Sequence, residues 1–161
     1  MMAVYANRLK KSRTLKGLLI PEHIYITGEN SKASVIEMLV AKAAQITGQD
    51  ANKILESVLN REKLGSTVIM PGLALPHAKI AGNAPLILCA VSEAGIPYPG
   101  ESEQPVNLIL LLLTPAGNTN LQLQLLAEIA SHFKGKNTAD MIIPGLTAQA
   151  VHNYIFTQPK T

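Results

Sequence analysis

The chain of 161 residues is 47% hydrophobic, which is enough apolar material to bury the core of one domain. Its formal net charge of +3 comes from the N-terminal end, where five basic residues precede the first acidic residue, Glu22. The rest of the chain is mildly acidic, and the whole sequence holds two Phe, four Tyr and no Trp. Because single-stranded nucleic acids are bound by aromatic side chains that alternate with basic ones, this composition argues against a nucleic-acid partner.

Residues 1–13 are interpreted as a basic tail, and residues 14–157 as the single domain. A short basic tail is most often a solvated extension, and contact with an anionic membrane or with nucleic acid is the alternative. No apolar signal region follows the basic residues, and the longest aliphatic run, residues 108–113, is far shorter than a bilayer requires. We therefore expect a cytoplasmic protein without a transmembrane segment.

Four helices are expected, two before and two after a group of strands. They span residues 31–47, a stretch that follows residue 50 and closes just after residue 61, a stretch from 118 or 119 to about 133, and one from about 147. The residues expected to cap or end the first two helices are Ser31 or Ser34, Gly48 and Asp50.

Three short apolar segments between these helices predict buried strands, at residues 73–75, 86–92 and 106–113. The third is apolar at nearly every position, which is typical of a strand covered on both faces. Residues 95–105 contain prolines and glycines and predict an irregular surface loop. The element order indicates an α/β fold, an α+β sandwich in which helices flank a mixed β-sheet on both faces.

One histidine, His77, directly follows Pro76 at the end of an apolar segment. The proline ring fixes φ and has no amide proton, so it holds the chain extended and presents the next side chain. A neutral imidazole is a competent nucleophile near neutral pH, since its unperturbed pKa is about 6.5. Groups that suit a phosphate lie upstream: an arginine, two hydroxyls and glycines that let backbone amides approach a ligand, namely Arg61, Ser66, Thr67, Gly65 and Gly72.

Three blocks occur in order along the chain: LNREKLGST at 59–67, LALPHAKI at 73–80, and GIPY at 95–98 followed by QPVNLILLLLTPAGNTN at 104–120. Together they resemble the enzyme IIA domain of the bacterial sugar phosphotransferase system, in its fructose, mannitol and nitrogen-regulatory (type 2) form. The resemblance implies that His77 accepts a phosphoryl group from HPr or its nitrogen-branch counterpart. The group would then pass to a IIB partner or serve as a regulatory signal.

The resemblance also implies a phosphotransferase component that needs no cofactor and no bound metal. It places Arg61, Ser66 and Thr67 beside His77, which would lie at a strand end in a shallow depression. The sequence contains no Walker-type lysine loop, so the expected donor is another phosphoprotein rather than ATP.

Two departures from the family pattern leave a second function open. Many members carry a second histidine in the first turn of the helix after the long strand, where this chain has Gln122. Gln122 can donate a hydrogen bond to a phosphoryl oxygen but cannot carry a positive charge. The approach to the Pro-His pair also keeps only Gly72 of a glycine-rich segment. Both departures favour the alternative, a non-catalytic docking module that controls a transporter or kinase.

The loop at 96–99, with Ile96 and Tyr98, is the expected docking site for the phosphoryl donor, because such sites combine exposed apolar side chains with a polar rim. Arg61 has an alternative role, in which it caps the carbonyls at the end of its own helix. The remaining polar candidates are expected to be structural or solvated: Cys89 as a buried thiol, His23, His132 and His152 as surface or helix residues, and Glu101 and Glu103 as solvated carboxylates.

Overall fold

A computed structural model describes residues 12–143 and 145–157, so the predicted basic tail lies almost wholly outside the described residues. The elements in chain order are α2 (Leu15–Leu18), η1 (Pro21–His23), β1 (Ile24–Ile26), α3 (Lys32–Thr47), α4 (Ala51–Glu62), β2 (Val68–Met70), β3 (Leu73–Ala74), β4 (His77–Ile80), β5 (Leu86–Ile96), β6 (Val106–Pro115), α5 (Thr119–Phe133), η2 (Thr138–Met141) and α6 (Ala148–Thr157).

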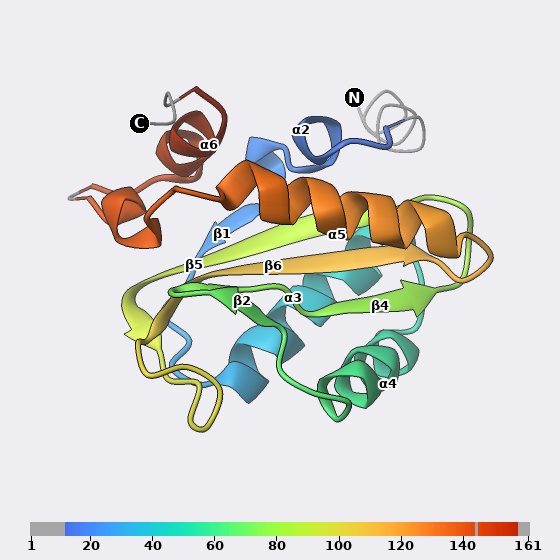
Figure 1. Ribbon diagram of the computed structural model, residues 1–161. Helices are drawn as coiled ribbons and strands as arrows, with labels where there is room; N and C mark the ends of the chain where they lie inside the picture. Colours follow the sequence, from blue (N-terminus) through green and yellow to red (C-terminus); the bar gives the residue numbers. More distant parts are fainter. Residues whose placement is uncertain (1–11, 144, 158–161) are drawn as a thin grey trace.

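The strands form one mixed sheet in the order β1-β5-β6-β3-β2, and β4 also pairs with β6. The pairs β1–β5, β3–β6 and β4–β6 are parallel, whereas β5–β6 and β2–β3 are antiparallel. Helices α2, α5 and α6 cover one face of the sheet, and α3 and α4 cover the other (Figure 1). The prediction of a mixed sheet with helices on both faces is confirmed.

Side chains of the two central strands alternate between the two helical layers over residues 86–91 and 108–113. On β6, Leu108, Leu110 and Leu112 pack toward α2, α5 and α6, while the residues between them pack toward α3 and α4. This two-sided burial explains why the strand is apolar at nearly every position, and each such side chain contributes about 1.5–3 kcal/mol by leaving water. Cys89 lies in the same core on β5, and its burial raises the pKa of its thiol well above the ordinary value. It is the structural thiol that the sequence predicts.

The helix boundaries follow from local hydrogen bonds. The side chain of Ser31 accepts from the amide of Ser34, and Gly48 ends α3 with a φ of 73°. Asp50 accepts from the amide of Asn52 at the start of α4. These expected caps are confirmed, as is the start of α5, where the side chain of Asn118 accepts from the amide of Leu121.

The strands at the edges of the sheet differ from the prediction. Strands β1, β2 and β4 were not expected, and β5 continues to Ile96, beyond the predicted end at residue 92. The strand predicted at residues 73–75 ends just before Pro76, yet β4 begins directly after the proline. The register explains this, because Leu73 pairs with Leu108 and His77 pairs with Leu112, the same offset on either side of the proline. Strands β3 and β4 are therefore two parts of one path along β6.

Within residues 12–143 and 145–157, no helix is both long enough and apolar enough to cross a membrane.

Candidate functional site

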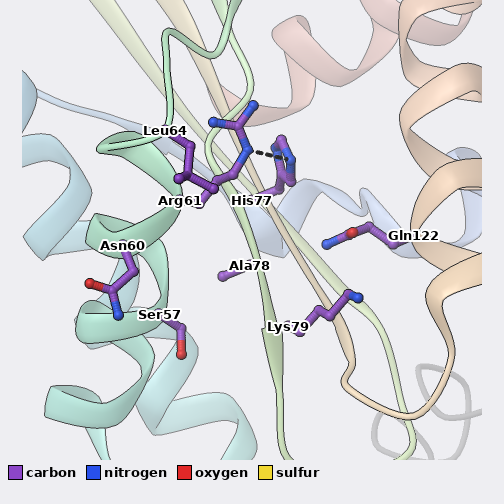
Figure 2. A pocket seen from close by; sticks show the side chains of 8 residues that line it. All are labelled: Ser57, Asn60, Arg61, Leu64, His77, Ala78, Lys79 and Gln122. Carbon is purple, nitrogen blue, oxygen red and sulfur yellow. Dashed lines mark hydrogen bonds between the residues drawn. The ribbon is translucent and has the colours of Figure 1, made fainter.

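His77 is the first residue of β4, and its side chain is half-buried at the wall of an open pocket of about 410 Å³. The pocket lies between α4 and the start of α5, at the end of the sheet where β4 runs alongside β6 (Figures 1 and 2). Along β4 the buried side chains Ala78 and Ile80 alternate with the more exposed His77 and Lys79. The pocket is lined by Ser57, Asn60, Arg61, Leu64, His77, Ala78, Lys79 and Gln122.

Both ring nitrogens of His77 have defined partners. Nδ1 lies 2.9 Å from the carbonyl oxygen of Leu75, and the Nε–H of Arg61 donates to Nε2 over 3.2 Å (Figure 2). Because a carbonyl can only accept, the proton resides on Nδ1, and Nε2 keeps its lone pair. The backbone of the residue two positions earlier therefore selects the tautomer in which Nε2 is the nucleophilic atom.

The surroundings also keep the ring uncharged. Burial lowers the pKa of His77 below its ordinary value of 6.5, and the positive charge of Arg61 lowers it further. The hydrogen bond to Leu75 and the carboxylate of Glu62 act in the opposite direction without reversing the shift. At neutral pH the ring is therefore in the neutral form that a nucleophile requires, with its one proton on Nδ1.

Arg61 comes from the last turn of α4 and makes two contacts with its guanidinium group. Besides donating to His77, it donates from Nη1 to the carbonyl of Gly65 over 3.1 Å. Gly65 has a φ of +146°, which favours glycine and lets the chain turn sharply after α4. The carbonyl of Gly65 is thus the one after α4 that Arg61 caps, which was its alternative role. Arg61 also reaches His77, as the sequence predicts.

Gln122 and Lys79 line the same pocket from different elements, α5 and β4. Figure 2 shows the amide of Gln122 extending from α5 toward the pocket, and its expected hydrogen bond to a phosphoryl oxygen stays a prediction. Lys79 was not singled out by the sequence reasoning. Its ammonium group donates to the hydroxyl of Thr119 over 2.9 Å. The signal that could have found it is the period of two along a strand that begins at His77.

The two hydroxyls of the REKLGST block have other partners and do not line the pocket. Thr67 is 4% exposed and donates to a carboxylate oxygen of Glu62 over 2.7 Å. The Ser66 hydroxyl accepts from the amide of Val68 over 3.1 Å and also bonds to Glu101. The structure therefore does not place the two hydroxyls beside His77 as expected. Thr67 does hold the carboxylate of Glu62, the residue next to Arg61 in the sequence.

The structure does not bring Gly72, an expected phosphate-binding residue, to the pocket. Gly72 lies five residues before His77, roughly 16 Å along an extended chain, and its carbonyl accepts from the amide of Leu108. It has a φ of +83°, and an added Cβ would overlap the hydroxyl of Thr138. The glycine is needed for a left-handed turn and for close packing against η2.

The expected docking residues are also wrong, because Ile96 is 0% and Tyr98 2% exposed. Ile96 belongs to β5, and Tyr98 packs beneath Lys32, whose ammonium lies 5.3 Å from the ring centroid. The same ammonium group lies 2.7 Å from carboxylate oxygens of Glu62 and Glu101. Glu101 is therefore an ion-pair partner rather than a solvated residue, whereas Glu103 is exposed as expected.

The other three histidines are not at the pocket. His132 and His152 lie in α5 and α6, in agreement with the expectation. His23 lies in η1 but is 0% exposed, so it is a core residue and not a surface one. Within the part of the chain that the structure describes, no group of three His, Cys, Asp or Glu residues could hold a metal ion.

Residues 18–157 match the model of a family described as "Phosphoenolpyruvate-dependent sugar phosphotransferase system, EIIA 2". The chain belongs to this family. A relative from Bradyrhizobium diazoefficiens, named nitrogen regulatory protein, is 35% identical over 82% of this chain and 87% of its own length. A protein of the same name from Pseudomonas aeruginosa is 31% identical over 78% of this chain and 82% of its own length.

Solved EIIA structures have the same fold. The nitrogen regulatory protein IIA-Ntr from Neisseria meningitidis superimposes with a TM-score of 0.76 and 24% identity, over 88% of this chain and 98% of that one. IIA mannitol from Escherichia coli has a TM-score of 0.65 and 14% identity, over 83% of this chain and 96% of that one. The predicted membership of the type 2 EIIA family and the predicted fold are thus confirmed.

Proposed function

We propose that this EIIA domain is a phosphohistidine carrier in which Nε2 of His77 accepts a phosphoryl group from another protein. The observation that carries the proposal is the state of Nε2, which faces an open pocket, keeps its lone pair and is in contact with the guanidinium of Arg61. The carbonyl of Leu75 holds the ring in this orientation. A positioned nucleophile and a nearby cation are the two requirements for moving a phosphoryl group between proteins.

The transfer balances without a metal ion or a base. The lone pair of His77 Nε2 forms a bond to phosphorus while the N–P bond of the donor phosphohistidine breaks, and its electron pair returns to the donor ring. If the donor ring also keeps a proton on its other nitrogen, no proton has to change hands. The ring of His77 becomes more positive as the bond forms, and the Leu75 carbonyl that accepts from Nδ1–H stabilises that charge.

Arg61 is the residue that would bind the phosphoryl oxygens during the transfer. In the free protein its Nε–H occupies the lone pair of Nε2, so it must leave the nitrogen as phosphorus arrives. Its Nη1 contact with Gly65 keeps the side chain beside the ring during that movement. Guanidinium groups bind phosphoryl oxygens with charge-assisted hydrogen bonds, and Arg61 can therefore change partner without leaving the pocket.

The proposed donor is a carrier of the HPr type, and the proposed acceptor is a IIB domain or a regulated transporter or kinase. A structural neighbour, IIA mannitol of Escherichia coli, is known as a complex with a phosphorylated IIB partner, at 13% identity to this chain and a TM-score of 0.66. In place of the buried loop residues, we expect partners to dock on two exposed apolar side chains. Leu64 lines the pocket and is 82% exposed, and Leu123, which follows Gln122 on α5, is 59% exposed. The cytoplasmic location stays a prediction.

Incubation with phosphoenolpyruvate, enzyme I and a panel of HPr-type carriers tests the proposal. Intact-mass measurement should find one added phosphoryl group that is lost in acid and kept in alkali. The group should be absent from His77→Ala and present in His152→Ala, a control in another half-exposed histidine. If no carrier phosphorylates the wild-type protein, the carrier function is refuted, and the docking module favoured by Gln122 takes its place.

A further inference from the structure

The pocket holds a second cationic side chain besides Arg61. Lys79 lies two residues after His77 on β4, so both side chains project from the same side of the strand, with Cα atoms about 7 Å apart. Ala78 between them is buried on the other side of the strand. The strand itself therefore places the base of the Lys79 side chain near the nucleophile.

The ammonium group has a neutral partner in the unphosphorylated protein. Lys79 is exposed, and its Nζ donates to the hydroxyl of Thr119, the first residue of α5. Figure 2 shows its side chain reaching from β4 into the space that Gln122 enters from α5. The ammonium group has no anionic partner among the residues that line the pocket, because none of them is a carboxylate.

A phosphoryl group on Nε2 would bring about two negative charges into this pocket. Arg61 can neutralise part of that charge from the α4 side, but Gln122 on the α5 side has no charge to offer. We propose that Lys79 binds the phosphoryl group of phosphorylated His77 and supplies the positive charge that Gln122 lacks. This inference rests on the proposed function and deepens it, because it names the residue that compensates for an uncharged side chain.

The step involves an exchange of hydrogen-bond partners. As the bond between Nε2 and phosphorus forms, Lys79 leaves the Thr119 hydroxyl and donates to a phosphoryl oxygen, and the lysine remains protonated throughout. Its four-carbon stem has the freedom that this movement requires. The phosphoryl group is then held between a guanidinium from α4 and an ammonium from β4, with the amide of Gln122 as a neutral third donor.

Four variants and a chemical donor test the inference independently of any protein partner. Phosphoramidate transfers its phosphoryl group to histidine when its own N–P bond breaks and ammonia leaves, so the rate at His77 can be followed by mass spectrometry. Lys79→Gln should lower this rate by about tenfold, the effect of losing one charge-assisted hydrogen bond. Lys79→Arg should restore most of it. Lys53→Gln removes an exposed lysine from the first turn of α4, about 12 Å from Arg61 along the helix, and should change nothing.

Thr119→Val separates binding of the phosphoryl group from a structural role. If Lys79 merely ties β4 to α5 through the hydroxyl, Thr119→Val should slow the reaction as much as Lys79→Gln, and that result would overturn the inference. A rate for Lys79→Gln equal to that of Lys53→Gln would overturn it as well. Failure of every protein donor, combined with the expected phosphoramidate rates, would refute the carrier function and leave the role of Lys79 intact.

Discussion

Two histidines of this protein both have a lowered pKa and a carbonyl partner for Nδ1, but they differ in their exposure to solvent. His23, between α2 and the sheet, has Nδ1 at 3.1 Å from the Leu18 carbonyl and 3.0 Å from the Ile87 carbonyl. His77 has Nδ1 at 2.9 Å from the carbonyl of Leu75. In both, burial is the main cause of a lowered pKa, and in both the carbonyls place the proton on Nδ1. His23, however, is 0% exposed, whereas His77 opens onto a pocket.

The comparison shows which property makes a histidine a candidate nucleophile. A lowered pKa and a fixed tautomer are compatible with a core residue that only satisfies backbone carbonyls, which is the role of His23. At His77 the same features coincide with an accessible Nε2 and a cation in contact with it. The difference between the two regions is therefore the pocket and Arg61, and the predictions below change these features one at a time.

The largest effect is expected from Arg61→Gln, which removes the positively charged group in contact with His77 and keeps a polar side chain. The rate of phosphoryl acceptance should fall about 100-fold, because one preorganised donor to a phosphoryl oxygen is lost. The pKa of His77 should rise at the same time, since the positive charge of Arg61 helps to lower it. Quench-flow with a phosphorylated carrier measures the rate, and NMR titration of the ring measures the pKa.

Lys63→Gln is the matched control, because it removes a neighbouring positive charge that is exposed and does not line the pocket. It should leave the pKa of His77 unchanged and the rate within a factor of about two, since surface charges are screened by salt. Equal loss of rate in the two variants would mean that Arg61 acts only through the overall charge of the surface and not through contact with Nε2.

The next effect concerns stability rather than transfer. His23→Leu keeps the volume of the side chain but takes the donor away from the carbonyls of Leu18 and Ile87. It should lower the free energy of unfolding by about 1–3 kcal/mol, the cost of a buried acceptor that loses its partner. Urea denaturation measures the loss. His23→Gln retains an N–H donor and should lose less, and both variants should still accept phosphoryl groups at His77.

Much of the fold could be predicted from the sequence because its signals are local. Helix α3 has a serine that caps it and a glycine that ends it, and β6 has the unbroken apolar run of a strand covered on both sides. The edge strands could not be predicted in the same way. Strands β1, β2 and β4 have four residues or fewer, and their pairing depends on partners distant in the sequence.

The site was predictable where the chemistry depends on neighbours in sequence and not where it depends on packing. Pro76 precedes His77 and Arg61 closes α4, and these features are visible in the sequence alone. The burial of Tyr98 depends on its packing against Lys32 from another part of the chain, and proline-rich composition could not reveal it. Likewise, the hydroxyl of Thr67 donates to Glu62, and Thr67 does not line the pocket.

The smallest effect is the dependence of stability on pH, and its sign follows from the two lowered pKa values. The unfolded chain titrates near the ordinary pKa of about 6.5, whereas His23 and His77 in the folded state titrate below it. As pH falls below 6.5, the unfolded state takes up protons first, so the stabilising contribution present above that pH is lost as pH falls through the folded values. Each histidine can add at most about 1.4 kcal/mol per pH unit to this slope.

Urea unfolding from about pH 7.5 to about pH 5 should show this slope in the free energy of unfolding, and His23→Gln should make the slope flatter. An equally steep slope in His23→Gln would mean that His23 titrates alike in both states, and the parallel between the two histidines would fail.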